Sequence, residues 1–344
     1  MFDFSRRRRC RRGLFLAAAL FVLAAGAQAA TTLVINAFLP PTDPFNVGVV
    51  KPWAADIEKA TAGRVRIQFP PTSLAAPDQL WNSVRNSIVD GAYFFNGTVQ
   101  GQLKLVQMAH LPFTSTSARA NSIALWRTYE KFFAAADEYK DVHLLALVVL
   151  PSSRLYSLKQ PLESTRDLQG HKVWALPGVP AKVMELAKAG VVSTPAAKMS
   201  EIVAGGTVDA FVGIPDMYAE GFKVIRYAKS ATTIPGGIGT ASFSLVINKQ
   251  KWDSLPKADR DIITKLSGEA FAARTGALDE ADAAAHQRAL DHGLAYRAAA
   301  PAFVDEIRRI AAPIEQSWLA DAQSRHVDGR AALDFYIAQS APQP

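Results

Sequence analysis

Aromatic side chains stand at or near the ends of the predicted strands, where a small molecule could be bound. Ligands of α/β proteins lie in crevices at the carboxyl ends of their strands. Each ring taken singly is better explained by core packing, but a set of rings at strand ends favours an apolar binding cleft. Together with a polar residue and a glycine at the same strand ends, the candidate ligand-binding residues are Phe38, Phe95, Asn96, Trp174, Phe211 and Gly213.

Arg154 is the one cation near these strand ends that could hold an anionic group of a ligand. A guanidinium can bind a carboxylate through two parallel hydrogen bonds, so Arg154 joins the candidate ligand-binding residues. A salt bridge between two lobes explains the same residue equally well, and the sequence leaves both interpretations open.

The patterns that enzymes and metal sites require are missing from the sequence. The six histidines are scattered along the chain (positions 110, 143, 171, 286, 292 and 326), and no His-Glu-x-x-His motif occurs. There is no Gly-x-Ser-x-Gly elbow and no Gly-x-Gly-x-x-Gly after a strand. We therefore predict no catalytic residue, no metal and no cofactor. A secreted α/β enzyme is the weaker alternative, because it needs a nucleophile–base pair or a metal in the cleft.

The N-terminal segment carries most of the net charge. Residues 1–29 hold six Arg and one Asp, which leaves only about +2 of the net +7 for the rest of the chain. No basic face is left to follow a nucleic acid backbone. The basic start, the apolar run Leu14–Ala25 and the small-residue site Ala27-Gln28-Ala29 predict a signal peptide that is cleaved near Ala29. We expect a monomeric mature protein in a bacterial periplasm; a retained anchor and a twin-Arg export route stay open.

Cysteine chemistry is excluded from the mature chain that this cleavage would leave. Cys10 is the only cysteine and precedes the cleavage site. Neither a disulfide nor a thiol nucleophile is then available.

Strand and helix patterns alternate after the signal segment. Predicted strands over 32–38, 64–69 and 91–97 are separated by amphipathic helices over 44–61 and 78–89, the second with Leu80, Val84 and Ile88 on one face. This order predicts a parallel sheet covered by helices. Further strands are predicted over 143–150, 154–158, 172–176, 207–213 and 238–248, with helices over 118–133, 181–189, 200–204 and 218–227.

The pattern divides the mature chain into two lobes. The first lobe is predicted over 30–151, with about 240–275 returning to it, and the second over 152–239, with part of the C-terminal helices of 276–344. Hinges are expected near Pro151–Ser153 and Gly236–Gly239. A long helical region, from Ser254 to about Leu294, is long enough to lie across both lobes. The predicted fold class is α/β: a two-lobed periplasmic-binding-protein clamp with mixed, mostly parallel sheets and a long spanning helix.

Several segments resemble the extracytoplasmic solute-binding proteins of TRAP (tripartite ATP-independent periplasmic) transporters. The resemblance covers nearly all of the mature chain and rests on the order and spacing of five segments: 61–67 (TAGRVRI), 111–113 (LPF), 167–173 (DLQGHKV), 206–210 (GTVDA) and 246–256 (VINKQKWDSLP). It implies a protein that closes on a small solute, mostly an organic acid, and delivers it to the small and large membrane subunits of a permease. A binding protein that serves a sensor kinase would share all these residues and stays open as an alternative.

Two positions depart from the pattern of this family. The family holds the ligand carboxylate with an Arg that falls at Trp174, and a frequent Asn falls at Gly213; a second family Arg is present as Arg154. A charged hydrogen bond contributes about 1.5 to 3 kcal/mol. Trp offers instead a broad apolar face with one donor, and it favours a ring, an apolar body or a cation. The sequence thus predicts a solute that depends less on a clamped carboxylate, aromatic or cyclic, with any anionic end at Arg154.

Overall fold

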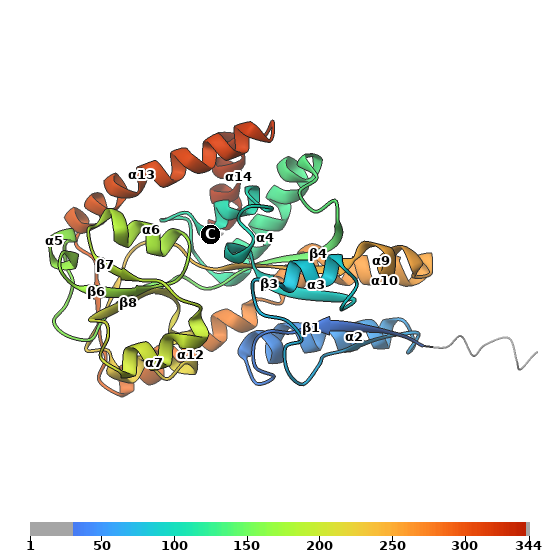
Figure 1. The fold of residues 1–344 in the computed structure, drawn as a ribbon, viewed down its shortest axis with the longest axis horizontal. Coiled ribbons are helices and arrows are strands. Elements are labelled where there is room, and N and C mark those ends of the chain that lie inside the picture. Colours follow the sequence, from blue (N-terminus) through green and yellow to red (C-terminus); the bar gives the residue numbers. More distant parts are fainter. Residues whose placement is uncertain (1–29, 342–344) are drawn as a thin grey trace, which may run out of the picture.

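The computed structural model describes residues 30–341 as two lobes, each built around its own sheet (Figure 1). The signal peptide predicted over 1–29 lies outside the described residues. In Figure 1 the first lobe, with β1, β3 and β4, lies on the right, and the second, with β6, β7 and β8, on the left. This architecture confirms the predicted two-lobed α/β clamp.

The sheet of the first lobe has five strands in the order β2-β1-β3-β10-β4. β1 pairs in parallel with β2 and β3, whereas β10 runs antiparallel between β3 and β4. The predicted strand over 238–248 therefore lies in the first sheet, as β10. The bounds are β1 Thr31–Asn36, β2 Val65–Gln68, β3 Gly91–Phe95, β4 Val142–Val149 and β10 Ser242–Asn248.

The sheet of the second lobe has six strands in the order β11-β9-β5-β8-β6-β7. β5 runs antiparallel to both of its neighbours, β8 and β9, and the other pairs are parallel. Each sheet thus holds one strand that opposes the rest, which confirms the mixed, mostly parallel character. The bounds are β5 Arg154–Ser157, β6 Lys172–Ala175, β7 Gly190–Val192, β8 Ala210–Ile214, β9 Ser230–Thr233 and β11 Ala295–Ala298.

Helices cover both sheets. In the first lobe α2 packs on β2, α3 on β3 and α4 on β4, while in the second lobe α6 packs on β6 and β7 and α7 on β6. The bounds are η1 Asn46–Val50, α2 Lys51–Ala60, α3 Leu80–Arg85, η3 Leu105–His110, α4 Ala118–Thr128, α5 Thr165–Leu168, α6 Val179–Leu186, α7 Met199–Ala204, α8 Asp216–Gly221 and α9 Lys249–Ser254.

Two helical stretches connect the lobes. The predicted long helix is present as three successive segments, α10 (Lys257–Leu266), α11 (Gly268–Ala273) and α12 (Gly276–Asp291). α11 packs on α4 and β4 of the first lobe, and α12 packs on α8 of the second. α13 (Pro301–Ser324), which the sequence did not identify as a bridge, lies along the other side of the molecule, from α6 of the second lobe to η3 of the first (Figure 1). α14 (Gly329–Ser340) then packs on α4.

The chain crosses between the sheets over residues 150–153 and 234–241, at the predicted hinge positions. Hydrogen bonds join the crossings: Ser153 Oγ donates to the Gly239 carbonyl (2.5 Å), and Thr240 Oγ1 donates to the Pro151 carbonyl (3.0 Å). Gly236 has a φ of +72°, and a Cβ there would lie 2.4 Å from the backbone of Phe113. Only glycine fits this contact without moving the loop.

Some predicted elements differ from the structure. The helix predicted over 78–89 ends at Arg85, because Ser87 has a φ of +60° and turns the chain. Ile88, expected on the buried face, is 67% exposed, so that expectation is wrong. The sequence also missed the strands β7, β9 and β11. They are three or four residues long, and β9 and β11 contain mainly small or polar residues that carry little strand signal.

Candidate functional site

Rings from the first lobe form one contact network at the ends of β1, β3 and β10. The Phe38 ring centroid lies 5.3 Å from Tyr93 and 5.9 Å from Phe243, and Phe95 lies 6.0 Å from Phe243. Phe38 and Phe95 are half-buried, whereas Tyr93 and Phe243 are buried. The predicted pair Phe38 and Phe95 is therefore joined by Phe243, a residue that the sequence analysis did not select.

Rings from the second lobe lie in one row across β6, β8 and β5. Trp174 is in register with Phe211, and Phe211 with Tyr156, whose ring centroid lies 4.4 Å from that of Phe211. All three rings are completely buried. They belong to the same hydrophobic cluster as Tyr93 and Phe243 of the first lobe. The aromatic residues of the two lobes thus belong to one buried apolar cluster, and we call its rings the aromatic layer.

Trp174 does not present an open face, contrary to the expectation that it looks into a cleft. Its side chain has no exposed surface, and its Nε1 donates a hydrogen bond to Thr194 Oγ1 (3.0 Å) in the loop after β7. The N–H that was expected to be free for a ligand is therefore satisfied within the second lobe.

Gly213 has no room for the side chain that the family resemblance leads one to expect. Its φ is +97°, and a Cβ would lie 2.7 Å from Leu176 Cβ and 2.9 Å from Pro180 Cβ. An asparagine would need the β6–α6 turn to move. The absence of the amide at this position follows from the close packing of that turn.

Asn96 is completely buried in a polar network instead of facing an opening. Its Nδ2 donates to Ser242 Oγ (2.8 Å), and its Oδ1 accepts from Ser244 Oγ (2.6 Å). His110 Nε2 accepts from the Ser242 backbone N–H (3.0 Å), and burial lowers the pKa of His110 to about 4. The imidazole ring also stacks on Phe95. This network holds β3, η3 and β10 together directly behind the Phe95 ring.

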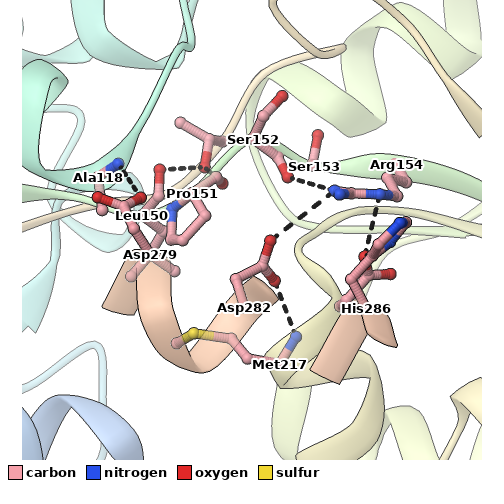
Figure 2. A network of polar contacts seen from close by, with 12 residues as sticks. Ala118, Leu150, Pro151, Ser152, Ser153, Arg154, Met217, Asp279, Asp282 and His286 are labelled. Carbon is pink, nitrogen blue, oxygen red and sulfur yellow. Dashed lines mark hydrogen bonds and ion pairs between the residues drawn. The ribbon is translucent and has the colours of Figure 1, made fainter. Parts of the chain in front are cut away.

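Arg154 lies at the first crossing and faces two carboxylates (Figure 2). Its Nε is 3.1 Å from Asp216 Oδ2, although the N–H is not aligned for a hydrogen bond, and its Nη1 is 3.9 Å from Asp282 Oδ2. Nη1 also donates to the Ser152 carbonyl (3.2 Å). Burial raises the pKa of Asp282 to about 6. Arg154 thus pairs with a carboxylate of its own lobe and with one on the spanning helix α12. The expected salt bridge between two lobes and the expected ligand contact both stay predictions.

Asp216 is fully buried and has a complete set of donors. Oδ1 accepts from Tyr156 (2.5 Å) and Tyr296 (2.9 Å), and Oδ2 lies 2.9 Å from His286 Nδ1. The carboxylate therefore joins β5, β11, α8 and α12 around the Arg154 guanidinium.

A hydrogen bond connects the two lobes near the aromatic layer. Tyr218 Oη, on α8 of the second lobe, donates to Asp43 Oδ1 (3.3 Å), in the loop after β1 of the first lobe. The Phe45 backbone N–H donates to the same oxygen (2.9 Å). Burial raises the pKa of Asp43 to about 6. Neither residue of this pair belongs to a motif or was among the predicted site residues.

A hollow of about 530 Å³ opens at the carboxyl ends of β1 and β2, and we call it the β1–β2 hollow. It lies where α/β proteins commonly bind ligands, and its size is within the usual range of small-molecule pockets. Of the predicted site residues only Phe38 lines it. The lining is formed by Ala37, Phe38, Leu39, Pro40, Pro41, Asn46, Lys51, Phe69, Pro70, Pro71, Thr72 and Ser73.

A second hollow of about 440 Å³ lies where η3, α6 and α13 meet. Its two lysines both have acidic partners: Lys104 Nζ is 2.5 Å from Asp321, and Lys182 Nζ is 3.6 Å from Glu185. Within residues 30–341, no group of three potential metal ligands and no helix long and apolar enough to cross a membrane is found.

Two α/β lobes joined by two crossing loops and sharing a layer of aromatic residues define a clamp-type solute-binding protein. Comparison with known sequences gives the family: residues 35–321 match bacterial extracellular solute-binding protein family 7 (DctP), and the chain belongs to this family. It is an extracytoplasmic solute-binding protein of the TRAP type, as the sequence resemblance implied. The family is one of binding proteins, so the enzyme alternative is wrong.

Similar proteins of known sequence or structure support this assignment. The chain is 46% identical over 332 residues, 96% of its own length and 98% of the relative, to a Comamonas testosteroni protein described as outer membrane transporter protein TsaT. A TRAP periplasmic solute-binding protein from Bordetella bronchiseptica with bound mandelate is 31% identical with a TM-score of 0.85, covering 90% of this chain and 98% of that one. A TRAP solute-binding protein from Rhodoferax ferrireducens with co-purified benzoate is 27% identical with a TM-score of 0.81 and the same coverage.

Proposed function

We propose that the protein captures an organic acid with an aromatic or cyclic body in the periplasm and delivers it to the small and large membrane subunits of a TRAP permease. The observation that carries this proposal is Trp174, which occupies the position where the family resemblance leads one to expect a carboxylate-holding Arg. Trp174 lies in one apolar layer with Phe211 and, across the lobes, Phe243. Such a layer favours a ring over a chain of polar groups.

The charges around Arg154 support the same class of solute. Arg154, the second cation that the resemblance implies, has Asp216 and Asp282 within 4 Å. A carboxylate ligand would have to compete with these two buried acids for the guanidinium. Arg154 is therefore poorly suited to clamp a solute with two carboxylates, whereas a ring with one anionic group needs only one cation.

The relatives of known structure support an aromatic solute. The Bordetella bronchiseptica protein binds both enantiomers of mandelate, and the Rhodoferax ferrireducens protein was obtained with benzoate. Both ligands combine one ring with one carboxylate. The proposal extends this ligand class to the present chain.

A thermal-shift screen of the mature protein tests the proposed ligand class. Benzoate, mandelate and related aromatic acids are compared with C4 dicarboxylates and with amines at equal concentration. Aromatic acids are expected to raise the melting temperature most, because a ligand that binds only the folded state stabilises it. Trp174→Arg, checked for folding by circular dichroism, should shift the preference toward dicarboxylates. The largest shift with a C4 dicarboxylate, together with no gain from Trp174→Arg, would contradict the proposal.

Transport and export are tested separately. Vesicles that contain the two permease subunits should accumulate the identified solute under an ion gradient only when the binding protein is added. N-terminal sequencing of the protein from a periplasmic extract should begin close to Thr31 if cleavage occurs near Ala29. Accumulation without the binding protein would argue against delivery.

A further inference from the structure

The buried polar network between β3, η3 and β10 has a definite direction of hydrogen bonds. Ser244 Oγ donates to Asn96 Oδ1 (2.6 Å), so the Tyr139 hydroxyl, 2.7 Å away, donates to Ser244. On the other side of the amide, Asn96 Nδ2 donates to Ser242 Oγ (2.8 Å). The Ser242 hydroxyl keeps its own hydrogen for His110 Nε2, which lies 2.8 Å away. The chain of hydrogen bonds therefore runs from Tyr139 to His110.

This direction fixes the tautomer of His110. The Ser242 backbone N–H also donates to Nε2 (3.0 Å), so both hydrogens of Ser242 face the single lone pair of this nitrogen. Burial lowers the pKa of His110 to about 4, and the ring is therefore neutral at pH 7. A neutral imidazole carries one proton, which must then lie on Nδ1. His110 thus ends the chain with an Nδ1–H donor.

This donor has no acceptor within the described part of the protein. No hydrogen bond from His110 Nδ1 to any of residues 30–341 is found, although the residue is only 2% exposed. Nδ1 is also not one of the polar atoms in this range that lack both a partner and accessible surface, so a small part of it remains accessible. A nearly buried donor without a partner favours the binding of an acceptor from outside the protein.

His110 lies where the two lobes meet. A Cβ on Gly239, in the second crossing, would lie 2.7 Å from the His110 carbonyl and 3.4 Å from Pro180 Cδ of the second lobe. Pro180 is in the first turn of α6, directly after the loop that follows β6 and Trp174. His110 therefore lies beside the segment that follows Trp174, the position where the family resemblance leads one to expect a carboxylate-holding Arg.

The aromatic ring next to His110 keeps part of its surface free. Phe95 stacks on the imidazole, with 5.5 Å between the ring centroids, and it is half-buried. Its other neighbour, Phe243, is buried. An apolar face and a neutral N–H donor thus lie side by side at the meeting of the lobes. A solute that combines a ring with an oxygen acceptor matches this pair.

We infer that His110 is a specificity-determining residue: its Nδ1–H donates to a carboxylate oxygen of a solute held between the lobes, while the solute ring packs against Phe95. This inference rests on the proposed function and deepens it, because it names a first-lobe donor that acts in the absence of an Arg at position 174. A single neutral donor suits a solute with one carboxylate. The chain of hydrogen bonds from Tyr139 polarises the N–H and strengthens its bond to an anion.

Calorimetric titration of the mature protein with benzoate and with mandelate tests the inference. His110→Gln places an amide oxygen near the position of Nε2, so the bond from Ser242 is kept and the Nδ1 donor is lost. His110→Asn places an amide N–H near the position of Nδ1 and keeps the donor. We expect His110→Gln to bind both acids about tenfold more weakly and His110→Asn to recover most of the affinity.

His143→Gln is the matched control. It makes the same substitution at another half-buried histidine of the first lobe, whose ring stacks on Trp252 of α9. This variant should bind benzoate and mandelate like the wild type.

A second measurement uses the wild-type protein. Proton–nitrogen correlation spectra of the mature protein with isotopically labelled histidine identify the tautomer of each ring, and the spectrum of His110→Gln assigns the His110 signals. We expect a proton on His110 Nδ1 and a downfield shift of this proton when benzoate is added. The signals of His143 should not move.

Two kinds of result would overturn this inference while leaving the proposed function intact. The first is a His110 proton on Nε2, or a His110 signal that does not change with bound benzoate. The second is wild-type affinity in His110→Gln, or equal losses in His110→Gln and His110→Asn. Failure of the wild-type protein to bind any aromatic acid would overturn the proposed function and the inference with it.

Discussion

The Arg154 guanidinium and the Asp216 carboxylate form an ion pair, 3.1 Å from Nε to Oδ2, at the first crossing between the lobes. Asp216 has no exposed surface, and the side chain of Arg154 is only 15% exposed. The pair joins the start of β5 to α8, and Asp282 and His286 extend the contact to α12. This cluster sets the position of the second lobe against the helix that also reaches the first.

Removal of the Arg154 charge should destabilise the protein strongly. In Arg154→Met a buried carboxylate loses its cation, and losses of about 3–5 kcal/mol are typical of such changes. Urea unfolding at pH 7 measures the effect. Arg226→Met, at an exposed position beside Tyr227, is the matched control and should change stability by less than about 0.5 kcal/mol. Equal stability of the two variants would contradict the structural role of the pair.

The Asp43–Tyr218 hydrogen bond predicts slower release of a bound solute from the closed form. Tyr218→Phe removes the hydroxyl and keeps the ring, so a contribution of about 0.5–1.5 kcal/mol is lost. The dissociation rate, followed by stopped-flow fluorescence, should rise about two- to tenfold. Tyr227→Phe, which removes a hydroxyl that accepts from Arg226 of the same lobe, is the control. An unchanged dissociation rate would show that the bond does not hold the lobes together.

Asp43 predicts that closure becomes more favourable at lower pH. Burial raises its pKa to about 6, and the titratable groups that face it are Tyr93 and Tyr218. A closed form with a raised carboxyl pKa binds a proton more tightly than an open form, so closure gains free energy as the pH falls from about 7 toward 5. Solute affinity should rise over this range and should vary less in Asp43→Asn. The same pH dependence in both proteins would be evidence against this assignment.

His110 predicts the opposite pH dependence for global stability. Burial lowers its pKa to about 4, so the folded state binds fewer protons than the unfolded chain below pH 6.5. The contribution of neutral His110 to the free energy of unfolding is complete above about pH 6.5. It decreases toward pH 4, by at most about 1.4 kcal/mol per pH unit. His110→Gln should show a smaller decrease, whereas His292→Gln, at an exposed position, should match the wild type. His143 is half-buried, and burial lowers its pKa to about 4 as well. Part of the decrease in stability should therefore remain in every variant.

Much of the fold could be predicted from the sequence because hydrophobic periodicity marks the buried elements. The strands around Ile35, Phe94, Val148 and Ile247 are apolar runs, and they form the first sheet with its predicted returning strand. Strands β9 and β11 were missed because tertiary pairing at one side of the sheet, and not composition, makes them strands. The helix α13, which begins at Pro301, bridges the two lobes. Hydrophobic periodicity predicts a helix there but does not indicate which lobes it contacts.

The site was less predictable than the fold. Phe38 and Phe95 lie at strand ends of the first sheet, whereas Trp174 and Phe211 lie in the buried row across the second sheet. Strand position alone could not tell which of these rings stay accessible. Asp43 and Tyr218 carry no motif, since an isolated aspartate or tyrosine near a helix start is common. Their significance depends on which side chains lie beside them in three dimensions.

The central claim, that the solute is an aromatic or cyclic organic acid, is tested most directly by identifying what the protein carries. Mature protein purified from the periplasm under mild conditions is denatured, and the released small molecules are identified by mass spectrometry. We predict an organic acid with a ring, present in stoichiometric amount. An acyclic dicarboxylate at the same stoichiometry would contradict the claim.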